Sequence, residues 1–318
     1  MELLPDTLKK QLVLDQLAKD PLMQKGPDTI KEAIRQATGY DLTCVLVSIG
    51  PHKEWSGDGH DKLTPIRLSI YDIRDKWSGK WLRIWVIPNN HLADVVAYVW
   101  LTVIEEPRGM PIQSTTDCGS ETTQIYGIVN ALQELLQLEL PLDEIPAHRF
   151  LKSVHNIMIE RGWHRLHIQW GDTVAYEWNM GIISGIYNPD LPHHVDLATW
   201  LWSTLIQEKL DELKEEFNTH KICYDSKKVL PSGVSPNVAM ALYEDWPHVE
   251  YCLQPVDVNL IRKLKELIGG KDLVRFVSEG FATHCEGIFE NLGFSEITFQ
   301  NVWNVFSQML PLLFEENE

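Results

Sequence analysis

The chain has 318 residues, and it carries 28 Lys and Arg against 45 Asp and Glu, which gives a formal net charge of −17. Hydrophobic residues make up 44% and charged residues 23%, values that are typical of a folded globular chain and exclude disorder as the dominant state. So acidic a chain has no general attraction to nucleic-acid phosphates or to anionic membranes. A nucleic-acid role therefore requires a local basic surface or metal ions that offset the carboxylates.

The cysteines are scattered along the chain and form no C-x-x-C pair, which favours a reducing compartment over a disulfide framework or a zinc site. They are Cys44, Cys118, Cys223, Cys252 and Cys285. No run of about 18 apolar residues is present, so we expect no membrane span and no membrane partner.

Residues 1–50 are interpreted as a helical N-terminal segment that could be a shortened DNA-binding part. Leu and Val recur at helical intervals in the first twenty residues. A second helix is expected to begin at Asp28 or Thr29 and to end at Gly39. Two short helices joined by a turn are compatible with part of a helix-turn-helix.

Residues 51–245 are predicted to form an α/β core. A first strand is expected in EWSGDGHDK, and the alternating runs IRLSIYDI and KWLRIWVI flank the turn DKWSG, a pattern that predicts a β-hairpin. Trp81, Ile84 and Trp85 do not share one parity, which indicates a twist or bulge. Helices are then expected at 91–106, 121–137 and 152–170, with strands at 111–117 and 144–150.

This order of elements predicts a mixed five-stranded sheet with helices on both faces. After residue 195 the pattern is nearly all helical, and residues 246–318 are interpreted as a helical C-terminal extension. Ser235 followed by Pro236 suits a helix start, because proline lacks the amide that a first helical turn leaves unpaired.

Three acidic residues fall at the ends of predicted elements. Asp58 lies in the first strand, Asp117 ends the strand at 111–117, and Glu160 lies on the helix at 152–170. Converging carboxylates repel one another unless divalent cations neutralise them, and hard oxygen ligands suit Mg²⁺ or Mn²⁺. Two such ions can activate an attacking oxygen and stabilise a leaving one, as phosphodiester chemistry requires.

Small residues flank two of these acids. Gly57 and Gly59 are expected to permit close approach of a backbone or a metal beside Asp58. Gly119 fits a sharp strand-to-helix turn, and Ser120 is expected to cap the helix that follows.

One basic stretch, residues 146–170, has a net charge of +3 inside the acidic chain. Glu160 lies within it, so a metal-binding acid and phosphate-binding donors would be neighbours. The candidates to contact DNA are Lys152, Asn156, Arg161 and Arg165.

The sequence also resembles a known family. W-x-x-D at Trp55–Asp58, T-D-x-G at Thr116–Gly119 and S-x-x-N-x-x-x-E at Ser153–Glu160 resemble the three blocks of the retroviral-type integrase core, of the DDE transposase and integrase superfamily. The residues in these blocks are similar to those of the integrase-like proteins of mushroom-forming fungi. The likeness covers about residues 50–245, and GVSPNVAM resembles the segment that often closes such cores.

The resemblance implies an RNase H-like fold and a metal-binding catalytic triad of Asp58, Asp117 and Glu160, with Mg²⁺ or Mn²⁺ as cofactor. It implies DNA as the partner, joining of DNA 3′ hydroxyls to target phosphodiesters, a homo-oligomer as the active form, and a nuclear location. The chain departs from the family pattern in having Cys118 where Asn is common. The interval between Asp117 and Glu160 is also long, which an inserted strand or loop near residues 138–148 would explain.

Two other functions stay open. The acidic balance of the chain favours a catalytically idle, element-derived protein that binds DNA or another protein, and the same fold also serves RNase H-like nucleases. Asp61 is a rival metal ligand, and Asp75 is interpreted as a turn residue of the hairpin.

Overall fold

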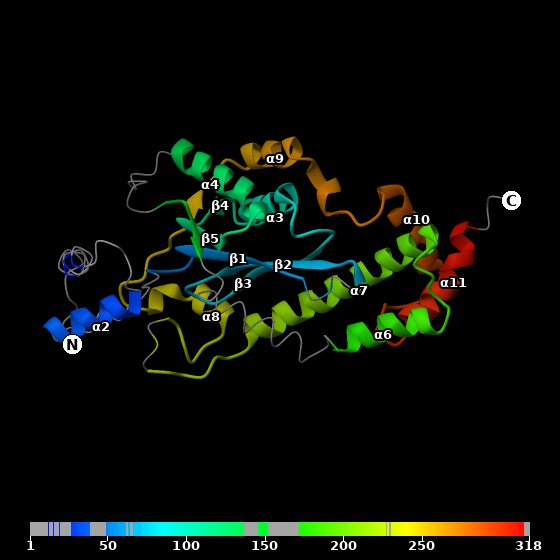
Figure 1. Ribbon diagram of the computed structural model, residues 1–318, viewed down its shortest axis with the longest axis horizontal. Coiled ribbons are helices and arrows are strands. Elements are labelled where there is room, and N and C mark those ends of the chain that lie inside the picture. Colours follow the sequence, from blue (N-terminus) through cyan, green and yellow to red (C-terminus); the bar gives the residue numbers. More distant parts are fainter. Residues whose placement is uncertain are drawn as a thin grey trace. The chain divides into compact units, whose positions relative to one another are not determined.

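The computed structural model describes residues 12, 15, 19, 27–38, 49–61, 63, 66–136, 146–151, 172–226, 228 and 230–314 (Figure 1). The chain divides into two compact units, Met1–Val47 and Ser48–Glu318, and each is treated by itself. In the first unit, helix α2 spans Pro27–Thr38, so it begins one residue before Asp28 and ends, as the stop signal predicts, just before Gly39.

All further elements belong to the second unit. Its strands are β1 (Glu54–His60), β2 (Ser69–Asp75), β3 (Trp81–Ile87), β4 (Gly109–Met110), β5 (Gln113–Asp117), β6 (His148–Leu151) and β7 (Gln254–Pro255). Its α-helices are α3 (Ala93–Glu105), α4 (Thr123–Leu135), α6 (Asp172–Ile183), α7 (Pro192–Thr219), α8 (Pro236–Ala241), α9 (Val258–Leu267), α10 (Glu279–Leu292) and α11 (Val302–Phe314). Short 3₁₀ turns are η2 (Ser120–Thr122), η5 (Tyr243–Asp245) and η6 (Gly270–Val274).

Five strands form one mixed sheet in the order β3-β2-β1-β5-β6, which confirms the predicted fold class. β1, β2 and β3 are antiparallel neighbours, whereas β5 runs parallel to both β1 and β6. The expected irregularity in the hairpin is a bulge. Ile73 pairs with Arg83 and Arg74 with Trp81, so Leu82 is the extra residue that shifts the parity of β3.

Helices cover both faces of this sheet (Figure 1). On one face, Tyr71 and Ile73 of β2 share a buried cluster with α3, α4 and α9. On the other face, Ile70 of β2 and Ile84 of β3 share a second cluster with α6, α7, α10 and α11. The two sets of side chains come from alternating positions of the same strands, because successive residues of a strand point to opposite faces.

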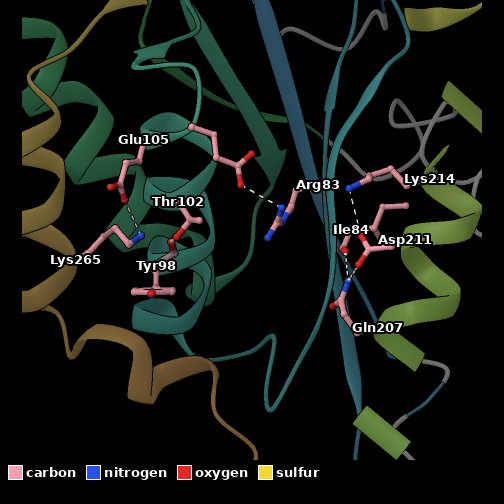
Figure 2. Close-up of polar contacts among 10 residues, drawn as sticks. Arg83, Ile84, Tyr98, Thr102, Glu105, Gln207, Asp211, Lys214 and Lys265 are labelled. Atoms are coloured by element: carbon pink, nitrogen blue, oxygen red, sulfur yellow. Dashed lines mark hydrogen bonds and ion pairs between the residues drawn. The ribbon is translucent and has the colours of Figure 1, made fainter. Parts of the chain in front are cut away.

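Two polar side chains of α7 form hydrogen bonds with the backbone of the edge strand β3. Asn218 accepts a hydrogen bond from the Trp81 amide and donates one to the Trp81 carbonyl, both at 2.9 Å. Gln207 accepts a hydrogen bond from the Val86 amide at 3.0 Å. It donates one to the Ile84 carbonyl at 3.2 Å (Figure 2). An edge strand exposes unpaired backbone groups, and these two side chains satisfy several of them.

The C-terminal helices pack into the same two clusters as the sheet. Ile261 of α9 is fully buried in the cluster that contains Tyr71, and Phe306 of α11 in the cluster that contains Ile70. Glu105 at the end of α3 also binds Lys265 of α9 at 2.8 Å (Figure 2). None of the helices in the described ranges is long and apolar enough to cross a membrane.

The structure differs from the sequence-based predictions in the start of one helix and in one additional pair of strands. The turn after Asp117 begins as a 3₁₀ helix with Gly119 at its N-cap, and no side chain caps it or α4. The prediction that Ser120 caps this helix is therefore wrong, because Ser120 already lies within the 3₁₀ turn. Strands β4 and β7 form a small antiparallel sheet that the sequence did not predict.

Ser235 is confirmed as a helix start, since its side chain accepts a hydrogen bond from the Val238 amide. The predicted helix at 152–170 and the predicted insertion near 138–148 lie, wholly or for the most part, outside the described residues.

Candidate active site

Asp58 and Asp117 lie on two adjacent parallel strands. Ser56 of β1 is in register with Thr115 of β5, and each aspartate follows two residues later. They are therefore level with each other, on one face of the sheet and at the carboxyl ends of both strands. The parallel pairing thus places acids that are far apart in the sequence about one strand spacing apart.

A third carboxyl group extends this row. Asp72 of β2 is the direct antiparallel partner of Asp58, so it shares the Asp58 face of the sheet. The Tyr71 hydroxyl group, on the opposite face, has its pKa raised by burial and further by the charges of Asp58, Asp72 and Asp117. The charges of all three acids thus act on the Tyr71 hydroxyl group. The sequence analysis missed Asp72, although an acid inside the apolar run SIYDI was the available signal.

Asp117 lies in a setting that disfavours a bare negative charge. Partial burial raises the pKa of its carboxyl group, and the nearby charge of Glu121 raises it further. The Glu121 carboxylate folds back over Gly119, where a Cβ atom would lie 1.8 Å from Glu121 Oε1. A side chain at position 119 would displace the flexible end of the Glu121 side chain, and Glu121 is a second acid that the sequence analysis missed.

The two glycines beside Asp58 face the opposite side of the sheet. A Cβ atom on Gly57 would lie 2.7 Å from the Trp100 ring, and one on Gly59 would lie 2.6 Å from Asn90 Nδ2. The expectation that these glycines admit a metal or backbone is wrong, because strand alternation points them away from Asp58.

The two other acids considered near the first strand have partners elsewhere. The Asp61 carboxylate lies 3.1 Å from the His91 ring nitrogen at an exposed position. Asp75 accepts hydrogen bonds from the Ser78 amide and hydroxyl and from the His52 amide, which confirms its role in the hairpin turn.

Glu160 and the four predicted DNA contacts lie outside the described residues, so their roles stay predictions. The contacts in question are Lys152, Asn156, Arg161 and Arg165. Within the ranges that the structure does describe, no three His, Cys, Asp or Glu residues are grouped closely enough to hold a metal ion. A complete ligand set would thus need a further residue beside Asp58 and Asp117.

The residues present fit a divalent cation. Asp58 and Asp117 supply hard carboxylate oxygens on adjacent strands. Beside Asp58 on the same face of the sheet, the fully buried carboxyl group of Asp72 has no side-chain hydrogen-bond partner for either oxygen in the described part of the chain. Like charges directly opposite each other across a sheet are destabilising, and burial together with the charge of Asp58 raises the pKa of Asp72 well above its ordinary value.

A five-stranded sheet of this order, with two aspartates at the carboxyl ends of its central parallel strands, defines an RNase H-like core. The family model of the integrase core domain matches residues 45–235, and the chain belongs to this family. A comparison with curated proteins gave no match.

Proposed function

We propose that this chain is a divalent-metal-dependent enzyme that cuts and joins DNA strands, of transposable-element origin. The observation that carries the proposal is the position of Asp58 and Asp117, level with each other on adjacent parallel strands. Membership of the integrase core family supports polynucleotidyl transfer as the ancestral chemistry.

Asp58 and Asp117 would hold the cation, Mg²⁺ or Mn²⁺, and Glu160 is proposed as the third ligand. Such ions, when bound, activate an attacking oxygen and stabilise a leaving oxygen. The attacking group would be water in nicking and a DNA 3′ hydroxyl in joining. Partial burial and the nearby charge of Glu121 raise the pKa of the Asp117 carboxyl group, so a bound cation would favour its ionised form.

The basic stretch at residues 146–170 would supply the DNA contacts, with Lys152, Asn156, Arg161 and Arg165 near Glu160. Two DNA ends must be handled together in strand joining, so the active form would be a homo-oligomer. A nuclear site of action is part of the same proposal.

A second function is favoured by one observation. Residues 171–318 carry a net charge of −13, which repels DNA phosphates. An element-derived protein that has lost catalysis and binds DNA or a protein partner would tolerate such a charge.

The test is incubation of the purified chain with supercoiled plasmid, a labelled duplex oligonucleotide and Mn²⁺. We expect nicking and joining that depend on Mn²⁺ and are abolished by Asp117→Asn, with the circular dichroism spectrum unchanged. Asp190→Asn, at an exposed position in a loop, is the matched control and should keep full activity.

Three results would count against the proposal. Cleavage that persists in purified Asp117→Asn protein would remove Asp117 from the site. Nicking without any joining would favour the RNase H-like nuclease, and a chain that binds DNA but never cuts it would favour the idle protein.

A further inference from the structure

Three basic side chains belong to the end of the sheet where β1 and β6 begin. Lys53 directly precedes β1, Lys76 directly follows β2, and Arg149 lies in β6. The charges of Lys76 and Arg149 both act on the Lys53 ammonium group, and the three are called the basic cluster. Arg149 belongs to the basic stretch at residues 146–170, whereas the two lysines come from distant parts of the sequence. A count of charges along the chain therefore does not reveal this cluster.

Only one member of the basic cluster has an acidic partner among the described residues. Lys76 Nζ lies 2.7 Å from a carboxylate oxygen of Glu54. No ion pair or hydrogen bond joins the side chain of Lys53 or of Arg149 to another residue in the described ranges. Cys252 lies near Lys53, but burial raises the pKa of this thiol to about 11, so it is neutral near pH 7. The cluster thus has an excess of positive charge in a chain whose net charge is −17.

The electrostatics of the cluster favour a bound anion. Lys53 is partly buried, and burial lowers the pKa of its ammonium group. The positive charges of Arg149 and Lys76 lower this pKa further. Arg149 is exposed on the edge strand β6, and its guanidinium group is charged at every ordinary pH. An anion bound here would offset the repulsion between the cations and favour the charged form of Lys53.

The basic cluster begins on the face of the sheet that carries the catalytic aspartates. Arg149 is in register with Thr115, two residues before Asp117, so it lies on the same face and about 7 Å nearer the amino ends of the strands. Each strand of duplex DNA rises about 3.4 Å per phosphate, so this separation corresponds to about two nucleotide steps. Lys53 precedes Asp58 by five residues, which is about 16 Å of strand, or about five nucleotide steps. One DNA segment is therefore long enough to reach both the aspartates and the cluster.

We propose that Lys53, Lys76 and Arg149 form a second DNA-contact surface, which binds backbone phosphates beside the metal site. Phosphate contacts from Lys and Arg hold a duplex in place without reading its sequence. The surface would hold the DNA on which Asp58 and Asp117 act, and it needs no metal ion to do so. This inference rests on the proposed function for the identity of the partner. The charge alone would also suit an acidic protein segment, and the shared face with the aspartates favours DNA.

The test is an anisotropy titration of a labelled duplex oligonucleotide with the full chain at several NaCl concentrations, with EDTA present so that no metal contributes. We expect the logarithm of the affinity to fall linearly with the logarithm of the salt concentration. Lys53→Gln and Arg149→Gln should each reduce the slope by about 1, and the double variant by about 2, because each removes one phosphate contact.

Lys263→Gln is the matched control, because Lys263 is an exposed lysine of α9, on the other face of the sheet. It removes the same charge from the chain and should leave the slope unchanged. Since Arg149 is exposed, Arg149→Gln should unfold in urea at the same concentration as the unchanged chain. A smaller slope in this variant would then report a lost contact and not a lost fold.

The outcomes separate this inference from the proposed function. An unchanged slope in the double variant, or no binding of duplex by the unchanged chain without metal, would overturn the DNA-contact surface. Mn²⁺-dependent cleavage that Asp117→Asn abolishes would still support the proposed function in that case. A polyglutamate peptide that binds more tightly than the duplex, and less tightly to the double variant, would assign the cluster to an acidic protein partner and overturn the inference. A smaller slope in a chain that never cuts DNA would support the surface while the proposed function fails.

Discussion

Gly57 occupies a position where the sheet leaves no room for a side chain. A Cβ atom there would lie 2.7 Å from the Trp100 ring and 3.0 Å from the Tyr71 hydroxyl oxygen. We expect Gly57→Ala to lower the free energy of unfolding by about 1–3 kcal/mol, since the core must shift to admit the methyl group. Urea denaturation measures this loss.

Gly287 in α10 provides the control, since nothing lies within 4 Å of its added Cβ. Gly287→Ala should raise stability by about 0.5–1 kcal/mol through helix propensity. Equal stability of the Gly57→Ala chain and the unchanged chain would show that Trp100 does not pack as described.

His148 gives the fold a specific dependence on pH. Burial lowers its pKa from 6.5 to about 4, and its ring nitrogens lie 2.8 Å and 3.0 Å from the Ser114 and Thr116 hydroxyl oxygens. The unfolded chain takes up a proton near pH 6.5, whereas the folded chain resists it until about pH 4. Stability is thus fully present above pH 6.5 and is lost as pH falls toward 4, by about 3 kcal/mol for this residue.

Chemical denaturation at pH 7 and pH 4.5 checks this dependence. His52 has the same lowered pKa of about 4, so His148→Gln should reduce the slope of stability against pH without removing it. A slope that is unchanged by His148→Gln would contradict a buried neutral ring.

The sequence predicted Asp58 and Asp117 as a pair, Asp58 from its place in the first strand and Asp117 from its place at a strand end before Gly119, and the structure places the two on adjacent strands. It could not identify Asp72, since the importance of that residue depends on which strand pairs with β1 and in which register. The roles of Gly57 and Gly59 were assigned to the wrong face of the sheet. Strand alternation decides that face, and the spacing of residues along the sequence does not reveal what packs there.

At the scale of the elements, the contact between α7 and β3 closes one edge of the sheet. The eleven residue steps from Gln207 to Asn218 span about 16 Å of helix, which matches the five steps of strand from Trp81 to Val86. Helix and strand therefore stay in register over this length, and two side chains bond backbone groups at both ends of β3.

We expect Asn218→Ala to lower the free energy of unfolding by about 2–4 kcal/mol, because it leaves the buried amide and carbonyl of Trp81 unpaired. Glu208→Ala, at an exposed position of the same helix, should change it by less than about 0.5 kcal/mol. Thermal and urea unfolding report both values. A similar small effect for the two variants would show that α7 does not close the edge.

The hairpin β2–β3 and helices α3, α7 and α9 follow from local patterns, so the sequence predicted them well. The β4–β7 ladder did not follow, since it joins Met110 to Gln254 across more than a hundred residues. The 3₁₀ start of the helix after Asp117 was also missed, because Ser120 has the residue type of a cap but lies one position inside the turn.

At the scale of the molecule, the helices that follow the residues matched by the family model belong to the core of the second unit. The match ends at residue 235, yet Ile261 and Phe306 are fully buried in the two clusters that flank the sheet. A chain that ends at Asp245 would expose the apolar surfaces that α9 and α11 cover.

We therefore expect the chain truncated after Asp245 to lose cooperative unfolding and to aggregate, as followed by calorimetry and light scattering. A chain that begins at Ser48 should keep its cooperative transition, because Ser48–Glu318 is a compact unit of its own. A truncated chain of residues 1–245 that unfolds cooperatively would show that the C-terminal helices are an addition to an independent core.

The most direct measurement is anomalous diffraction from crystals of the full chain soaked with Mn²⁺. A shared cation should give a peak about 2 Å from a carboxylate oxygen of Asp58 and of Asp117 alike. No peak at saturating Mn²⁺, or a peak that touches neither aspartate, would contradict the central claim that these two residues form one metal site.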